Sequence, residues 1–274
     1  MCNVICTAGG GSVGGHFLTT MAAQMHSDSR AIKRTRYLDA ARQILQRDGL
    51  DALTMQALAN QVGAAVGTMY GYFPSKGALV AELQKQAITT IIGAWRDARE
   101  VWTAALEDRG LTHPDIVLAE VVAFGEFFLA IQVDYSLEFD LNRAHLDDRN
   151  ELFESVDLNV VRPTAADLVQ GPAEAIEAGI DAGVLQADVA EIHERVLMLL
   201  LGLYGISLLA ISRPETTQTL VPDLTRMLVR DLTLGWGADR GALDRVTPIV
   251  RAVIDEHPLS SIGAADQRVP VTAG

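Results

Sequence analysis

Apolar residues recur along this chain with the spacing of amphipathic helices, and the strict alternation of a β-strand is nearly absent. One apolar face is especially clear between residues 54 and 73, where positions i, i+3, i+4 and i+7 are occupied. These positions are Met55, Leu58, Ala59 and Val62. Thr54 can cap the start of this helix, and Gly63 can end it in a left-handed conformation. The pattern predicts an all-α protein.

A second short helical run follows almost at once. Because a single residue separates it from Gly63, the two helices must cross sharply, as in a helix-turn-helix unit whose second helix enters the DNA major groove. Pro74 then ends that helix because it has no N–H, and Ser75 can cap a third helix. An earlier amphipathic helix at residues 37–45 stops before Gly49.

This unit resembles the N-terminal domain of the TetR family of bacterial transcription regulators. The pattern is Ala59-x-x-x-Gly63-x-x-x-Gly67-Thr68-x-Tyr70-x-Tyr72-Phe73-x-Ser75-Lys76, within a resemblance that covers residues 34–92. The resemblance implies a cytoplasmic homodimeric repressor that a small hydrophobic ligand releases from a palindromic DNA operator. The alternative is a DNA-binding activator or architectural regulator without such a ligand.

Composition divides the chain into four predicted regions. The glycine-rich run Gly9–Gly15 cannot hold a helix cheaply and offers no apolar face, and Met21 or Met25 is an alternative start. We therefore predict a disordered extension at residues 1–29, a helix-turn-helix domain at 30–92, a helical ligand-binding and dimerisation domain at 93–257, and a disordered tail at 258–274.

Charge is distributed unevenly between these regions. Residues 1–93 carry 8 Lys and Arg against 5 Asp and Glu, whereas the rest carries 14 against 30, within a net charge of −13. Salt screens the attraction to phosphates beyond about 8–10 Å, so a locally basic domain can bind DNA although the whole chain is acidic.

No residue pattern indicates catalysis, a cofactor or a metal. Cys2 and Cys6 precede the predicted folded regions and have no further Cys or His ligand nearby. Three histidines, His113, His145 and His193, could assemble an enzymatic site with carboxylates, but no nucleophile–base spacing supports it. We therefore predict that the protein is not an enzyme.

The predicted DNA contacts lie in the basic segment 30–36, in the cap of the first motif helix and on the outer side of the second. They are Arg34, Arg36, Thr54, Ala65, Val66, Thr68, Tyr70, Tyr72 and Lys76. The second helix offers no Arg, Asn or Gln for paired bonds with a base, so we expect its small side chains to touch thymine methyls. Its tyrosines and Lys76 suit phosphates, while Met69 and Phe73 are expected to pack inward. The alternative for the basic segment is a solvated helix start.

Further helices are predicted in the body at residues 116–133, 135–146, 151–182, 196–212, 220–236 and 239–257. Residues 196–212 carry no charge but fall short of the ~20 apolar residues that cross a bilayer, and Arg195 lies just upstream. An interface explains this helix better, since Gly202 and Gly205 would let two backbones approach. The resemblance implies dimerisation through this helix and the next, with two helices from each subunit forming a bundle.

Aromatic residues on the central body helices form the candidate ligand pocket. They are Trp102, Phe124, Phe127, Phe128, Tyr135 and Phe139, with Trp95, Glu126 and Asn142 nearby. The alternative for each aromatic is ordinary core packing. Taken together with the acidic body, they predict a small, largely hydrophobic ligand that is neutral or cationic.

Overall fold

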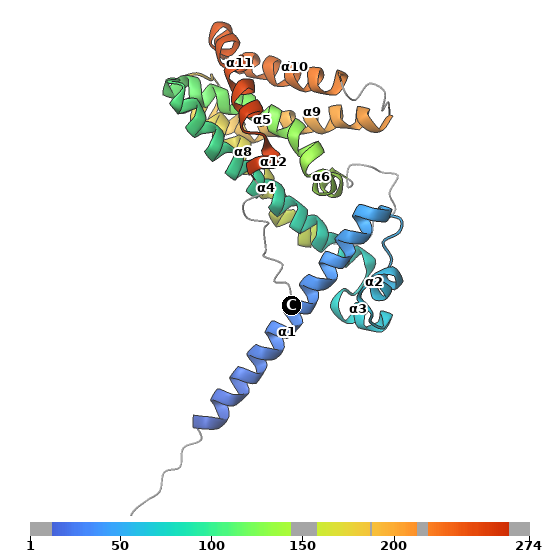
Figure 1. Ribbon diagram of the computed structural model, residues 1–274. Helices are drawn as coiled ribbons and strands as arrows, with labels where there is room; N and C mark the ends of the chain where they lie inside the picture. Colours follow the sequence, from blue (N-terminus) through green and yellow to red (C-terminus); the bar gives the residue numbers. More distant parts are fainter. Residues whose placement is uncertain (1–12, 144–157, 187, 213–218, 263–274) are drawn as a thin grey trace, which may run out of the picture. The chain divides into compact units, whose positions relative to one another are not determined.

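The computed structural model describes residues 13–143, 158–186, 188–212 and 219–262, and within these ranges the regular elements are helices and no strand occurs (Figure 1). The all-α class predicted from the apolar spacing is confirmed. The chain forms two compact units that divide in the sequence between Leu79 and Val80.

The first unit contains three helices and the start of a fourth. These are α1 (Val13–Asp48), α2 (Met55–Val62), α3 (Val66–Tyr72) and the beginning of α4 (Lys76–Asp108). α1 thus begins at Val13, inside the segment up to residue 29 for which the sequence predicts disorder. Residues 16–29 contain neither Gly nor Pro, so nothing interrupts the helix before the amphipathic segment begins. Residues 1–12 lie outside the described ranges.

A small apolar core holds the first unit together. Its members on α1 are Tyr37, Leu38, Ala41, Ile44 and Leu45, all buried. Leu58 of α2 and Met69 of α3 are both 0% exposed, and Phe73 is 1% exposed. Met69 and Phe73 therefore pack inward as predicted, and the opposite side of α3 is left outward.

The second unit contains the rest of α4 and the remaining helices. They are α5 (His113–Asp134), α6 (Ser136–Arg143), α8 (Leu158–Asp181), the short 3-10 helix η2 (Val189–Glu191), α9 (Ile192–Ser212), α10 (Leu220–Gly235), α11 (Arg240–Glu256) and α12 (Leu259–Ile262). The predicted helices at 135–146 and 151–182 are shorter in the described residues, and their facing ends lie outside those residues.

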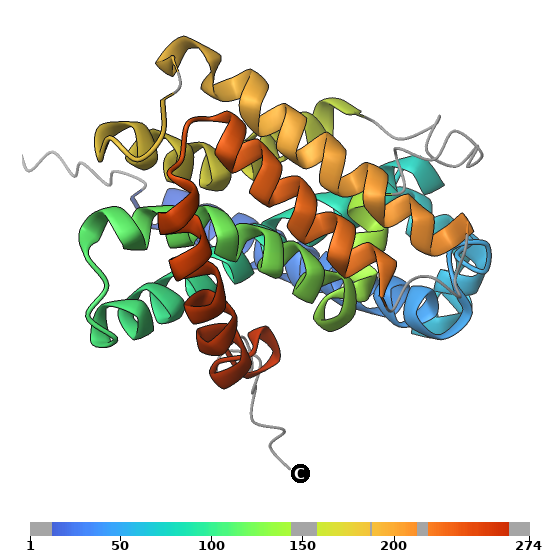
Figure 2. The same cartoon turned by 90° about the horizontal axis from the view of Figure 1, so that it is seen from above.

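α5 is the central helix of the second unit. The Thr112 side chain caps its start by accepting from the Asp115 N–H, and Pro114 fits the first turn because no intrahelical donor is needed there. α8, α10 and α11 pack along α5, while α9 runs beside α8 and α10 (Figures 1 and 2). This surrounding explains why α5 is apolar on nearly all sides.

The C-terminal segment adds two helices to this core. Trp102 Nε1 on α4 donates to the His257 carbonyl at 2.8 Å, directly after α11. The short helix α12 follows, and its Leu259 is 1% exposed. α12 thus lies inside the tail from Pro258 for which the sequence predicts disorder, and its Leu259 fills an apolar site. Residues 263–274 lie outside the described ranges.

Two glycines let α10 lie close to its neighbours. A Cβ on Gly125 of α5 would lie 2.7 Å from Val229, and one on Gly202 of α9 would lie 2.6 Å from Leu228. The expected place of Gly202 between subunits was thus wrong, because it packs against α10 of its own chain. A Cβ on Gly205 would meet nothing within 4 Å.

Two helices are long and apolar enough to cross a membrane on length and composition alone. The first is α5, whose most apolar window is 78% buried inside the unit, as befits a core helix. The second is α9, where the window Ile192–Leu209 is only 22% buried. The apolar outer side of α9 therefore needs a different explanation from that of α5.

Candidate DNA-binding surface and ligand pocket

The turn between α2 and α3 is fixed by the two caps that the sequence predicts. Thr54 Oγ1 accepts from the Ala57 N–H at 2.9 Å, which satisfies one free amide at the start of α2. At the other end Gly63 has φ 69° and ψ 38°, and its N–H and that of Ala64 bond back to α2 carbonyls. Only glycine adopts this left-handed backbone without a steric penalty, so the helix ends here.

α3 presents a row of small and aromatic side chains on its outer side. Ala65, Thr68 and Tyr70 are exposed, and Tyr70 retains 52% of its surface. Val66 and Tyr72 are half-buried. Ala65 occupies the N-cap position and makes no side-chain cap bond, as expected for alanine. The Thr68 N–H bonds back to the Ala65 carbonyl at 2.9 Å, and the amides before it depend on solvent or on a bound group.

Arg30 of α1 reaches the C-terminal end of α3. Its Nη2 donates to the Gly71 carbonyl at 2.8 Å, and its guanidinium lies 5.1 Å from the centre of the Tyr72 ring. That ring also meets Tyr37 edge-on, with 4.9 Å between ring centres. A positive charge at a helix C-terminus is favourable, so Arg30 stabilises the position of α3.

Arg34 and Arg36 also contact the motif. The Arg34 guanidinium lies 4.8 Å from the centre of the Phe73 ring. Arg36 Nη2 donates to the Val62 carbonyl at the end of α2, at 3.4 Å. The basic segment is thus neither a free arm nor merely a solvated helix start, because it joins α1 to α2 and α3. Sequence reasoning missed these bonds because their acceptors are backbone carbonyls, which carry no residue signature.

Lys76 is the first residue of α4. Ser75 caps this helix, since its Oγ accepts from the Ala78 N–H at 3.0 Å. Lys76 is half-buried, and the preceding Pro74 and Ser75 are exposed.

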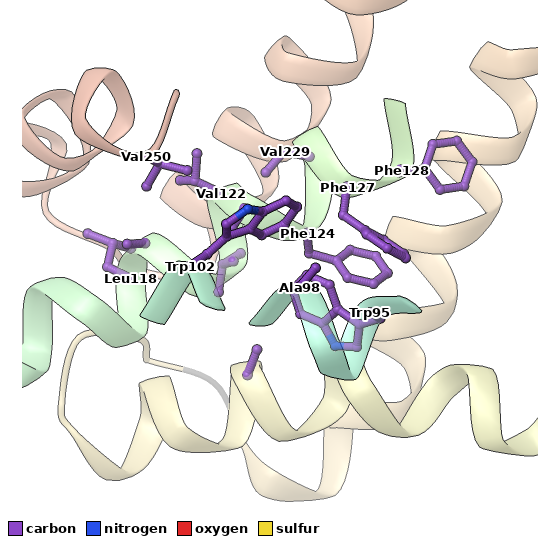
Figure 3. Packing of buried hydrophobic residues seen from close by; sticks show 14 of the residues in the cluster. Trp95, Ala98, Trp102, Leu118, Val122, Phe124, Phe127, Phe128, Val229 and Val250 are labelled. Carbon is purple, nitrogen blue, oxygen red and sulfur yellow. The ribbon is translucent and has the colours of Figure 1, made fainter. Parts of the chain in front are cut away.

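A cavity of about 470 Å³ lies among α4, α5, α8 and α9 of the second unit. Its walls are mostly apolar and aromatic. Residues that line it include Trp95, Phe124, Phe127, Phe128, Ile131, Leu168, Leu200 and Tyr204. Trp95 packs against two phenylalanines, with 5.1 Å from its ring centre to that of Phe124 and 5.1 Å to that of Phe127 (Figure 3). The volume suits a small molecule.

Three of the four charged residues that line this cavity, Arg96, Arg99 and Glu174, are held in ion pairs. Arg99 of α4 bonds Glu120 of α5 at 2.9 Å and Glu174 of α8 at 3.1 Å. Glu120 is 8% exposed and also accepts from Thr103 Oγ1 at 3.3 Å. This network ties three walls of the cavity together, and Asp167 on α8 is the lining charge that no ion pair among the described residues balances.

Half of the predicted pocket residues line this cavity. Those that do are Phe124, Phe127 and Phe128. Trp102 instead lies in the core with its nitrogen bonded to His257, and Tyr135 lies outside the lining at the end of α5. Phe139 packs against Tyr204, with 5.8 Å between ring centres, without reaching the cavity.

Tyr204 and the α8 wall were missed by sequence reasoning. Tyr204 is the one aromatic residue in the apolar run 196–212, which was the available signal. Its hydroxyl oxygen accepts from Asn142 Nδ2, and burial raises the pKa of its phenol to about 12. The hydroxyl is therefore neutral at physiological pH.

Glu126, which the sequence placed near the predicted pocket, does not line this cavity. It is 8% exposed and accepts from Arg226 Nε at 2.7 Å and from Arg251 Nε at 3.2 Å. These arginines lie on α10 and α11, on a different side of α5 from the aromatic wall. Its charge is thus balanced within the fold. Sequence patterns could not reveal this pairing because the partners lie 100 and 125 residues away.

The histidines considered for an enzymatic site lie apart. His113 begins α5 and His193 lies in the first turn of α9, and both are exposed. His145 lies outside the described residues. Among the residues that the structure describes, no three His, Cys, Asp or Glu side chains gather in a way that could hold a metal ion.

A capped helix, a left-handed glycine turn and a short helix with an exposed outer side make this chain a helix-turn-helix protein of the DNA-binding class. Comparison with known sequences points to a family over the same segment. The profile of the bacterial regulatory proteins of the tetR family matches residues 38–83. Over this segment the chain is similar to the TetR family of transcriptional regulators, which is not a class of enzymes.

Individual relatives agree over a short stretch. The HTH-type transcriptional repressor KstR of Mycobacterium tuberculosis is 41% identical over 54 residues, which are 20% of this chain and 24% of that protein. KstR of Rhodococcus jostii is 40% identical over 52 residues, which are 19% and 24% of the two chains. The chain thus matches about a quarter of the length of these relatives.

The likeness of fold extends further than the likeness of sequence. A crystal structure assigned to the TetR family, from Mesorhizobium loti MAFF303099, aligns with 76% of this chain and 98% of its own, with a TM-score of 0.50 and 15% identity. At this identity the comparison concerns the fold alone, and it agrees with the helical body described above.

Proposed function

We propose that this protein is a homodimeric transcriptional repressor of the cytoplasm that binds a palindromic DNA operator through α3 and releases it when a small apolar ligand enters the cavity. The observation that carries the DNA-binding part is the geometry of α2 and α3, with both caps in place and one side of α3 exposed. The relatives named repressors support the sign of regulation.

The proposed base contacts come from the start of α3. Ala65, Val66 and Thr68 offer methyl groups that can touch thymine, and none of them forms a paired hydrogen bond with a base. Specificity would then depend on apolar contacts and on the shape of the DNA.

The proposed phosphate contacts surround that site. Tyr70 and Tyr72 of α3 and Lys76 of α4 carry groups that donate to phosphate oxygens, and Thr54 lies at the start of α2. Arg34 and Arg36 carry five N–H donors each, so a bond to the Val62 carbonyl leaves Arg36 other donors for a phosphate.

The proposed dimer interface is the outer side of α9 and α10. Large apolar residues are exposed there, namely Leu197, Met198 and Leu201 of α9 and Leu220 and Met227 of α10. A patch of this kind on two adjacent helices is typical of a protein–protein interface. Because Glu194 and Arg195 lie in the first turn of α9, burial against a second subunit explains the patch better than insertion into a membrane does.

The cavity among α4, α5, α8 and α9 supports a ligand rather than the alternative of an architectural regulator or activator without one. It has mostly apolar walls and paired charges, so it favours a neutral apolar molecule. One coupling free energy would link ligand binding to operator binding. A molecule that binds the DNA-free dimer more tightly than the DNA-bound dimer must therefore weaken DNA binding.

Binding measurements on defined DNA test the proposal. We expect selection from random duplexes to yield a palindrome, on which Thr68→Ala and Val66→Ala reduce the preference over scrambled DNA by about 1–3 kcal/mol each. Lys76→Ala should weaken binding to both DNAs alike. It should also lower the slope of log K against log salt concentration by about one, because one phosphate contact is lost. Equal losses on both DNAs for the Thr68 and Val66 variants would contradict the base contacts.

A further inference from the structure

Trp95 brings a polar group without a partner to the ligand cavity. The residue is 6% exposed and lines the cavity from α4. Its indole nitrogen is buried and has no hydrogen-bond partner among the residues that the structure describes. Figure 3 shows this nitrogen on the edge of the ring that points away from Phe124 and Phe127. A buried donor without an acceptor is destabilising and uncommon, so this N–H calls for an explanation.

The neighbouring tryptophan shows what the fold normally provides. Trp102 lies two turns further along α4 and is 2% exposed. Its nitrogen donates to the His257 carbonyl at 2.8 Å, and Trp102 does not line the cavity. Of these two buried indoles on one helix, the one at the cavity is therefore the one whose donor is unused.

The wall that faces the Trp95 nitrogen belongs to α8. A Cβ on Gly171 would lie 2.7 Å from the indole Nε1 and 2.7 Å from Cδ1. Glycine thus lets the α8 backbone approach the indole edge this closely, and a residue with a Cβ would clash with the ring. Pro172 follows inside the helix and has no N–H for the Leu168 carbonyl, so this turn of α8 lacks one backbone bond and can yield more easily.

The charges around the cavity limit what can approach this donor. Arg96 bonds Asp97 at 3.0 Å, and Arg99 holds Glu120 and Glu174. Both arginines are thus already paired with carboxylates and do not attract an anion. Asp167 on the α8 wall would repel one. A neutral oxygen on an apolar frame can accept from the indole without disturbing these pairs.

We propose that the effector of this protein is a neutral, largely apolar molecule with an oxygen acceptor, such as a ketone, and that the Trp95 Nε1–H donates to this oxygen at the Gly171–Pro172 turn. This inference rests on the proposed ligand-sensing function and names the chemical class and the orienting residue. The aromatic and aliphatic walls hold the frame of the ligand, and Trp95 fixes its orientation.

A matched pair of probes tests the donor. 1-Tetralone and tetralin have the same bicyclic frame and differ by a carbonyl in place of a methylene. Calorimetry on the full-length protein gives the affinity for each probe, and the ratio compared is the affinity for the ketone divided by that for tetralin. We expect this ratio to be about 2- to 10-fold higher in wild type than in Trp95→Phe. The ketone should also move the indole N–H signal of Trp95 downfield in a ¹⁵N–¹H spectrum, whereas tetralin should not.

Two further variants guard against a folding artefact. Trp102→Phe removes an indole that lies outside the cavity, so it should keep the wild-type ratio although it loses the bond to His257. Gly171→Ala keeps Trp95 but places a methyl against its nitrogen, so it should lower the ratio as Trp95→Phe does. Melting curves identify any variant that has unfolded, and the spectrum of wild type provides a reading that needs no variant.

The outcomes separate this inference from the proposed function. An unchanged ratio in Trp95→Phe, an unmoved Trp95 signal or failure of both probes to bind would overturn the role of Trp95. A ketone that binds through Trp95 but leaves operator affinity unchanged would support that role and contradict the sensing mechanism.

Discussion

Tyr204 gives the second unit a contribution to stability that depends on pH. Burial raises the pKa of its phenol to about 12, and the bond from Asn142 Nδ2 acts in the opposite direction because it favours the phenolate. In the unfolded chain the phenol titrates near pH ~10. Between about pH 10 and 12 the unfolded chain therefore loses this proton while the folded protein retains it, so stability falls as the pH rises through that window.

Replacement of Tyr204 by Phe should remove this part of the pH dependence. We expect wild type to lose about 1–2 kcal/mol more stability than the variant between about pH 9 and pH 12. Urea unfolding at a series of pH values measures the difference. Parallel curves for the two proteins would show that the phenol is not shielded.

At this scale the sequence predicts which residues are buried better than it predicts their partners. Met69 and Phe73 follow from helical spacing, which is a local property. The Arg99–Glu120 pair and the bond from Trp102 to His257 join residues far apart in the chain, and they depend on how helices pack. The local sequence pattern of either segment does not predict a contact of this kind.

Among the elements, α2 and α3 are the best defined by their own residues. Gly63 ends α2 at φ 69°, where an added Cβ would touch nothing but would strain the backbone. Gly67 lies within α3, and an added Cβ there also meets nothing within 4 Å. The two glycines thus differ in backbone conformation and not in available space.

Alanine at these two glycines should have opposite effects. We expect Gly63→Ala to destabilise the first unit by about 1–2 kcal/mol, because a left-handed conformation is costly for any residue with a Cβ. Gly67→Ala should stabilise it by about 0.5–1 kcal/mol, because alanine favours the helix. Differential scanning calorimetry without DNA compares them, and a fall in stability for both would contradict the assignment.

The boundaries of the helices show where sequence reasoning stops. The caps Thr54 and Gly63 are visible as residue types, so the motif could be predicted closely. α1 begins earlier than predicted because a polar helix has no apolar stripe to reveal it. α12 exists because Leu259 fills a site made by other helices, and that site is not encoded in the tail itself.

For the whole molecule, the exposed apolar side of α9 and α10 determines the expected state of association. Leu201 is 61% exposed and Met198 is 58% exposed, although both are large and apolar. Burial of both in a two-fold interface would remove this surface from water in each subunit at once.

A charge in this patch should therefore separate the subunits. We expect Leu201→Glu to sediment as a monomer at micromolar concentration, because an unpaired carboxylate buried in an interface costs several kcal/mol, and to lose operator binding with it. Val133→Glu is the matched control, since Val133 is 78% exposed at the end of α5, outside the patch. A monomeric wild type at that concentration, or a dimeric Leu201→Glu, would contradict the proposed interface.

The bonds from Arg30 and Arg36 to the ends of α3 and α2 affect how mutants of this protein would look in a living cell. Loss of either guanidinium leaves a helix end without its positive charge, which destabilises the domain. A smaller fraction of the protein is then folded at higher growth temperature. The expression of a reporter gene under the operator would then rise, just as it would if the protein had lost a phosphate contact. Growth temperature distinguishes the two causes: cool cultures restore silencing for a folding defect, whereas a Lys76 variant stays defective at every temperature.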